Sequence, residues 1–196
     1  VAYVALYISH GFSLMTTVAL LGTISALVLT TVLSQITVSL AAFSGFVTEE
    51  SSLLTLFDGI DVSALVVAGM VLGAAGALDD VTVTQASSVW QIGRARPAAT
   101  FGELWSGGLR IGQHHIGSTV NTLLLAYLGA SLPLAVLFII AAQSLGTVVN
   151  SEVVAVEIVR TLVGSIGLVA AVPVTTWLAA RIVASQTRSV PPEAED

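Results

Sequence analysis

The chain of 196 residues has no cysteine and no lysine, and charged residues make up only 9% of it. Without cysteine, disulfides and thiolate metal ligands are excluded. The six basic residues are all arginine and the net charge is −6, so no basic surface is available for a nucleic acid. Soluble domains carry about 25% charged residues, whereas apolar residues fill 55% of this chain. The composition therefore predicts an integral membrane protein.

Four apolar segments are each long enough to cross a bilayer as a helix, which takes about 20 residues. Their apolar runs are too continuous for the alternating pattern of barrel strands. We therefore predict an all-α, polytopic transmembrane helix bundle. The predicted spans are residues 12–46, 62–90, 116–142 and 153–183.

The two ends of the chain have their own signals. Residues 1–8 are apolar and no charged segment precedes them, so they are not typical of a signal peptide. We interpret them as the end of a preceding span, and the chain as the C-terminal part of a longer protein. Residues 1–188 are predicted to form one transmembrane domain. The proline- and acid-rich residues 189–196 are predicted to be a disordered tail.

Arginine is unevenly distributed among the connections, and this predicts the orientation. Arg94, Arg96 and Arg110 lie between the second and third spans, and Arg181 and Arg188 end the fourth. We therefore place the 91–113 loop and the C-terminus on the cytoplasmic side of the plasma membrane. The connections predicted to face outward carry the acids Glu49, Glu50, Asp58, Asp61 and Glu152.

The arginine-bearing loop has a helical pattern of its own. Phe101, Leu104 and Trp105 recur at helical spacing, and tryptophan suits the membrane interface. We predict a short amphipathic helix on the cytoplasmic surface, which either connects the two spans passively or acts as a lever between them.

Asp79 and Asp80 lie inside the second span, where a charged carboxylate costs at least about 2.5 kcal/mol. At roughly 1.5 Å per residue, Asp79 lies roughly 25 Å from Val62, near the midplane. Two adjacent carboxylates at low dielectric cannot both ionise cheaply, which is the property that a proton carrier needs. We therefore interpret the two acids as the centre of a proton or ion pathway.

A stripe of small and polar residues runs along the same predicted helix. Gly69, Gly73 and Gly76 form a face that lets another helix approach closely. The stripe continues through Asp80, Thr84, Ser87 or Ser88, and Gln91 at steps of three and four residues, with Asp79 and Thr82 beside it. It is either a hydrophilic path or a packing face whose acids are capped by threonines or by a distant arginine.

The third span has a polar inner half. Asn121 and Thr122 lie inside it, and asparagine in a membrane helix is expected to hydrogen-bond to a neighbour. His114 and His115 lie at the inner boundary, where they either pass protons or only reach toward the interface. Adjacent helical residues point about 100° apart, so the two cannot easily share a metal ion.

The fourth span carries an acid and a base three residues apart. Glu157 and Arg160 are expected to form a structural ion pair on one helical face. In the alternative, Arg160 binds an anionic substrate or an acid of another helix.

Four motifs of the chain belong together: 76–85 (GALDDVTVTQ), 114–127 (HHIGSTVNTLLLAY), 157–168 (EIVRTLVGSIGL) and 172–176 (VPVTT). They resemble the YibE/F-like family of bacterial multi-pass membrane proteins. The resemblance extends over most of residues 10–185, with the 46–50 loop also fitting. It implies the plasma membrane of a bacterial cell, and it implies a fold and a topology more than an activity.

A more distant pattern resembles half of the transmembrane domain of proton-driven permeases of the resistance-nodulation-division superfamily, including SecD and SecF. That resemblance implies a proton-relaying role for Asp79 and Asp80, and it places Thr119, Asn121 and Thr122 on the polar helix that follows. The chain departs from the pattern because it has no large periplasmic domain and no second half. A two-fold arrangement would therefore require self-association.

Three hypotheses for function follow. The first is a proton- or ion-coupled permease subunit, not an enzyme, with no cofactor and no metal, that forms a homodimer in the bilayer or pairs with another membrane subunit. The second is a structural or accessory membrane protein. The third, a metal-dependent intramembrane enzyme using Asp79, Asp80 and a histidine, ranks last because no HExxH-type motif supports it. For the first, the predicted relay residues are Asp79, Asp80, Thr82, Thr84, Gln85, His114, His115, Asn121 and Thr122.

Overall fold

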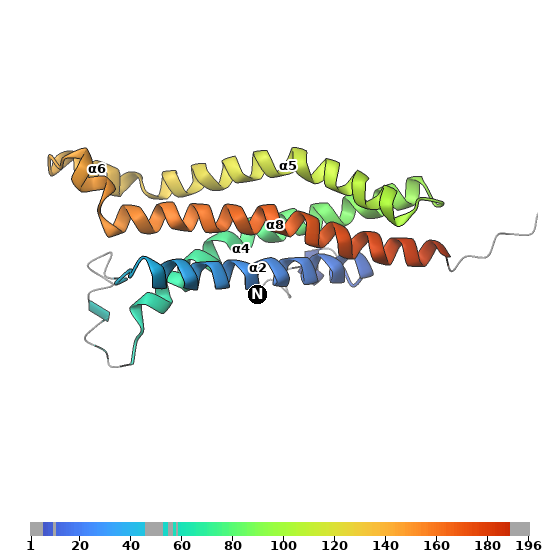
Figure 1. Cartoon of the computed structure of the whole chain (residues 1–196), viewed down its shortest axis with the longest axis horizontal. Coiled ribbons are helices and arrows are strands. Elements are labelled where there is room, and N and C mark those ends of the chain that lie inside the picture. Colours follow the sequence, from blue (N-terminus) through green and yellow to red (C-terminus); the bar gives the residue numbers. More distant parts are fainter. Residues whose placement is uncertain (1–5, 10, 46–52, 55–56, 58, 189–196) are drawn as a thin grey trace, which may run out of the picture. The chain divides into compact units, whose positions relative to one another are not determined.

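The protein is described by a computed structural model that covers residues 6–9, 11–45, 53–54, 57 and 59–188. The described part is helical, without a β-strand, so the all-α prediction is confirmed. The predictions for the acids Glu49, Glu50 and Asp58 and for the 189–196 tail concern positions outside the described residues. The helices, shown in Figure 1, are α2 (Leu14–Leu40), α4 (Val62–Ala95), α5 (Phe101–Ala130), α6 (Leu132–Ile140), α7 (Leu145–Val149) and α8 (Glu152–Arg188).

The predicted spans correspond to these helices. Among the described residues, α2, α4 and α8 are long and apolar enough to cross a membrane, and α5 with α6 adds a fourth span if the bent pair is counted as one. The two helices of this pair meet at an angle of 44°. Pro133, in the first turn of α6, explains the break because proline has no N–H to continue the hydrogen bonds of α5.

The predicted amphipathic segment is helical from Phe101, but it is not a separate element. It runs without interruption into the third span, so both belong to α5. A reciprocal cap starts the helix: Thr100 N donates to Glu103 Oε2 at 2.7 Å, and Glu103 N donates to Thr100 Oγ1 at 3.4 Å. Leu104 is fully buried, which is the amphipathic contact that the spacing predicts.

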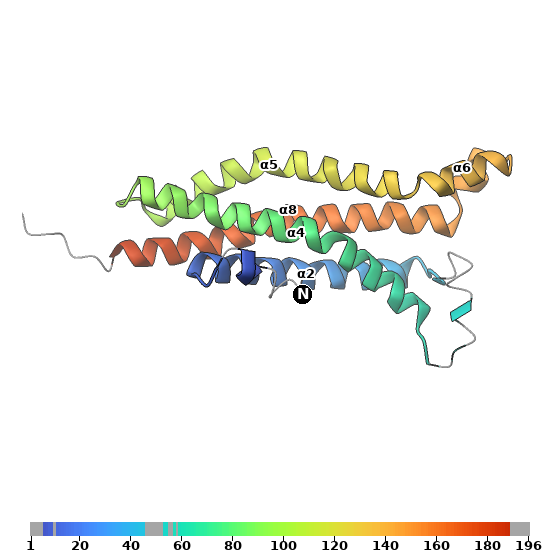
Figure 2. The same ribbon diagram turned by 180° about the vertical axis from the view of Figure 1, so that it is seen from behind.

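Contacts divide the chain into two units, and each long helix contributes to both. The first unit comprises residues 1–26, 77–119 and 168–196, and the second comprises 27–76 and 120–167. In the first unit, the C-terminal half of α4 lies beside the start of α5 (Figure 2), and the two are joined by a hydrogen bond from Gln85 Nε2 to the Gly108 carbonyl oxygen. Small side chains dominate its buried cluster, which contains Val18, Ala19, Ala86, Val89, Leu104, Ala179, Ala180 and Val183.

The second unit has its own buried cluster, formed by Val38, Val67, Met70 and Val156. A polar clamp lies at one end of this unit. Glu152 opens α8, and its Oε1 accepts from Gly45 N at 2.9 Å while its Oε2 accepts from Ser44 Oγ at 2.8 Å. The sequence placed Glu152 only in a connection predicted to face outward. The structure shows that it also ties the segment after α2 to the start of α8.

Candidate functional site

Asp79 lies at the middle of α4, seventeen residues after Val62 and sixteen before Ala95. Its side chain is half-buried, and Thr23 Oγ1 of α2 donates a hydrogen bond to Asp79 Oδ1 at 3.4 Å. The acid at mid-span therefore contacts a second membrane helix within the first unit.

Thr23 connects this carboxylate to a second hydroxyl. Its Oγ1 lies 2.6 Å from Thr82 Oγ1, and both threonines are buried. The single hydrogen of the Thr23 hydroxyl is shared between Asp79 Oδ1 and the Ala19 carbonyl oxygen, which lies 3.1 Å from Thr23 Oγ1. Thr82 Oγ1 donates to the Asp79 carbonyl oxygen at 3.0 Å. Thr23, Asp79 and Thr82 thus form a polar contact between α2 and α4, which we call the Thr23–Asp79–Thr82 cluster.

Thr23 is not among the residues predicted from the sequence, although the sequence contains a signal for it. Thr16, Thr23 and Thr30 are spaced seven residues apart, which is about two helical turns, so they share one face of α2. All three are at most 1% exposed. A regular row of threonines in an otherwise apolar span indicates a buried polar face.

Gln85 forms a second buried polar contact in the same unit. Its Nε2 donates to the Gly108 carbonyl oxygen at 2.7 Å and to Thr176 Oγ1 at 2.6 Å. Thr176 Oγ1 in turn donates to the Val172 carbonyl oxygen at 2.6 Å. These bonds join α4, α5 and α8, so Gln85 works here as an interhelical clamp.

The two adjacent acids have different surroundings. Asp79 is half-buried against α2, whereas Asp80, the next residue on the helix, is exposed on the surface of the chain. Thr84, one turn after Asp80, is half-buried. The adjacency of the two acids in the sequence suggested one shared, buried site. The structure instead buries only Asp79 in part and leaves Asp80 exposed.

The polar residues of α5 lie mostly at the surface. His114, Asn121 and Thr122 are exposed, while His115 is half-buried. His115 Nε2 is buried without a hydrogen-bond partner. Three of the four predicted relay residues of α5 are therefore exposed on the surface of the chain.

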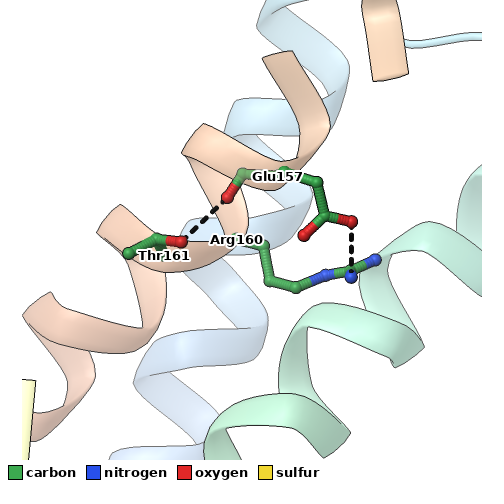
Figure 3. A network of polar contacts seen from close by, with 3 residues as sticks. All are labelled: Glu157, Arg160 and Thr161. Carbon is green, nitrogen blue, oxygen red and sulfur yellow. Dashed lines mark hydrogen bonds and ion pairs between the residues drawn. The ribbon is translucent and has the colours of Figure 1, made fainter. Parts of the chain in front are cut away.

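Glu157 and Arg160 form the expected ion pair in the second unit. Arg160 Nη1 lies 2.8 Å from Glu157 Oε1, and the two side chains are 25% and 28% exposed, respectively. Thr161 Oγ1 donates to the Glu157 carbonyl oxygen at 2.9 Å (Figure 3). The pair and its neighbour all lie on one turn of α8.

The chain matches a protein-family model. The model described as YibE/F-like protein matches residues 1–185. The chain belongs to this family. The 76–85 motif by which the sequence resembles the family contains Asp79, Thr82 and Gln85, which make the two buried polar contacts described above. No curated protein and no solved structure matches the chain.

The glycine face of this YibE/F-like protein has one clear partner inside the chain. A Cβ atom at Gly73 would lie 2.6 Å from the Tyr127 hydroxyl of α5, and one at Gly69 would lie 3.6 Å from Arg160 Nη2. A Cβ atom at Gly76 would have no other atom within 4 Å. Gly73 therefore permits a close approach between α4 and α5, while Gly76 lies against open space.

Within the described ranges, no group of three or more His, Asp or Glu side chains comes together in a way that could hold a metal ion. The histidines of α5 and the acids of α4 do not form such a group.

Proposed function

We propose that this membrane protein is a proton- or ion-coupled permease subunit, with Asp79 and Asp80 as the carriers. One observation carries the proposal: the carboxylate of Asp79, at the midpoint of a membrane helix, contacts a hydroxyl of another helix. A charge at that depth is expensive, so it is rare in structural positions. The coupling of protonation to this helix contact is what a proton-driven permease requires.

The Thr23–Asp79–Thr82 cluster supplies groups suited to a proton path. A hydroxyl both donates and accepts hydrogen bonds, so the two threonines can receive a proton on one side and release it on the other. Their oxygens lie 2.6 Å apart, a short hydrogen-bonding distance. A change in the protonation of Asp79 alters the contact with Thr23, and this links proton binding to the packing of α2 on α4.

Proton flux into proteoliposomes, followed with an enclosed pH-sensitive dye, tests this proposal. The variant carrying both Asp79→Asn and Asp80→Asn is expected to lose flux while it stays folded, because asparagine keeps the shape but cannot titrate. Full flux in the double variant would overturn the permease proposal.

The second candidate is a structural or accessory membrane protein, and the Gln85 clamp favours it. Gln85 cannot titrate, yet it lies in the same motif and joins three helices. In this role Asp79 would also serve packing through Thr23. Asparagine at Asp79 would then leave function unchanged, whereas alanine would lower stability by removing hydrogen bonds.

The exposure of Asp80 supports self-association. An ionisable side chain facing lipid at mid-span is costly, and such residues normally face protein or water. Gly76 lies four residues before Asp80, which is one helical turn, so the two share one face of α4. A Cβ atom added at Gly76 would meet open space, so this face leaves room for another helix. We propose that a second copy of the chain packs on this face and forms a homodimer. A partner membrane subunit on the same face is the alternative.

Replacing Gly76 by leucine is expected to lower the dimer fraction at least about tenfold without loss of stability, because leucine would hold two helices apart. Single-molecule photobleaching in liposomes, at increasing lipid dilution, measures that fraction. Gly129→Leu is the matched control, since Gly129 also has no atom within 4 Å of an added Cβ. Gly73→Leu is unsuitable because leucine would clash with Tyr127 of the same chain. A dimer that survives Gly76→Leu would rule out this interface.

The arginine distribution supports a cytoplasmic 91–113 loop. The chain has no cysteine, so single cysteines report the orientation directly. Position 98, between α4 and α5, and position 143, between α6 and α7, are both exposed. An impermeant thiol reagent added to intact cells is expected to label a cysteine at 143 but not one at 98, and permeabilisation should expose both. The reverse pattern would invert the topology.

A further inference from the structure

A partly open cavity of about 500 Å³ lies within the second unit, and none of its lining residues belongs to the Thr23–Asp79–Thr82 cluster. It is formed by the end of α5, by α6 and α7, and by the start of α8. Its volume falls in the range of about 300–1,000 Å³ that is usual for small-molecule sites. The walls are mainly hydrocarbon and include Leu124, Leu128, Leu134, Phe138, Ile158 and Leu162.

Glu157 is the one charged group among the described residues that line this cavity. Only one of its carboxylate oxygens takes part in the ion pair with Arg160 (Figure 3). The other, Oε2, is buried and has no hydrogen-bond partner. An unsatisfied buried acceptor costs about 1–3 kcal/mol, and a ligand that donates a hydrogen bond would recover part of it.

The polar chemistry of the cavity also limits the charge of its occupant. Glu157 is already neutralised by Arg160 at 2.8 Å, so a neutral donor fits better than a second cation. Tyr127 also lines the cavity, and its hydroxyl is buried without a partner. A hydrocarbon body suits the walls, and one hydroxyl group suits the free oxygen of Glu157.

We propose that this cavity binds a neutral amphiphile, with a hydrocarbon body and a single hydroxyl that donates a hydrogen bond to Glu157 Oε2. Such a molecule comes either from the membrane, as a hydroxyl-bearing lipid, or from outside it, as a free long-chain alcohol. Binding does not depend on proton transport by Asp79, so failure of one proposal leaves the other standing.

Photoaffinity labelling of the full chain in nanodiscs tests the site. The probe is a dodecanol carrying a diazirine near the end of its chain, and mass spectrometry locates the labelled residues. We expect saturable labelling of cavity-lining residues of α5, α6 or α8. Unlabelled 1-dodecanol should compete at least tenfold better than dodecane, which lacks the hydroxyl. Labelling that does not saturate, or equal competition by dodecane, would overturn the proposal.

Two tryptophan variants on α6 form a matched pair. Ala135 lines the cavity, whereas Leu137 is 60% exposed and is not among the lining residues. Ala135→Trp is expected to reduce saturable labelling at least tenfold by filling the space, and Leu137→Trp is expected to leave it unchanged. Equal labelling of the two variants would show that the probe binds elsewhere.

Glu157→Gln tests the polar contact. Glutamine keeps one oxygen for Arg160 but offers an NH₂ group where Oε2 accepts, so 1-dodecanol should compete about tenfold less well. Unchanged competition in a variant of normal thermal stability would exclude the bond to Glu157.

Lipid extraction identifies the source of the bound amphiphile. A hydroxyl-bearing lipid that leaves with the wild type and Leu137→Trp, but not with Ala135→Trp, supports a membrane lipid. Saturable labelling without such a lipid supports an alcohol from outside.

Discussion

Asp79→Asn is expected to reduce proton flux to the background of empty liposomes, whereas Asp80→Asn retains part of it. Asp79 is the acid that contacts Thr23 of α2, while Asp80 is exposed on the surface of the chain. Asparagine preserves the hydrogen bond from Thr23 but cannot bind or release a proton. The thermal stability of Asp79→Asn should be equal to or above that of the wild type, because a desolvated charge has been removed.

Thr23→Val separates a proton path from a merely structural contact. Valine has nearly the shape of threonine but no hydroxyl, and flux is expected to fall about tenfold, equal to about 1.4 kcal/mol in the barrier. Thr31→Val is the matched control, because the Thr31 hydroxyl donates only to the Leu27 carbonyl oxygen of its own helix at 2.8 Å. Equal flux in the Thr23 and Thr31 variants would remove Thr23 from the path. Wild-type flux in Asp79→Asn would favour the accessory role.

Hydropathy alone predicted most of the helical architecture. A long apolar segment has few alternatives in a membrane, since only helices satisfy their own backbone groups there, apart from closed barrels. The start of α4 at Val62 agrees with the prediction, and the Glu157–Arg160 pair follows from a spacing of three residues on one helix. Both are local features, which depend on a single element.

The features that could not be predicted depend on which helices meet. Periodicity shows which residues share a face, but not which neighbour that face contacts. For this reason the contact of Asp79 with Thr23, the position of Gly73 against Tyr127 and the different surroundings of Asp79 and Asp80 appear only in the structure. The continuity of α5 was missed because its polar start had been interpreted as a surface element.

Gly112→Leu is expected to cause the largest loss of stability of any single change considered for this chain. A Cβ atom at Gly112 would collide with Val172 Cγ1 of α8 and would lie 2.8 Å from Gln85 Oε1 of α4. Leucine would therefore push three helices apart and break the bonds from Gln85 to Gly108 and Thr176. Overpacking costs about 1–3 kcal/mol, and an unsatisfied buried amide adds about 1–3 kcal/mol more.

Thermal unfolding in detergent, followed by loss of the monodisperse peak, measures this effect against a matched control. Gly117 lies five residues further along α5 and has no atom within 4 Å of an added Cβ, so Gly117→Leu should be neutral or slightly stabilising. The smaller change Gly112→Ala should destabilise the protein as well, and Val172→Ala should restore part of the loss because it removes the methyl group in the way. Equal unfolding temperatures for Gly112→Leu and Gly117→Leu would contradict the close packing of α5 against α8 at Gly112. They would also contradict the hydrogen bonds of Gln85, which depend on that packing.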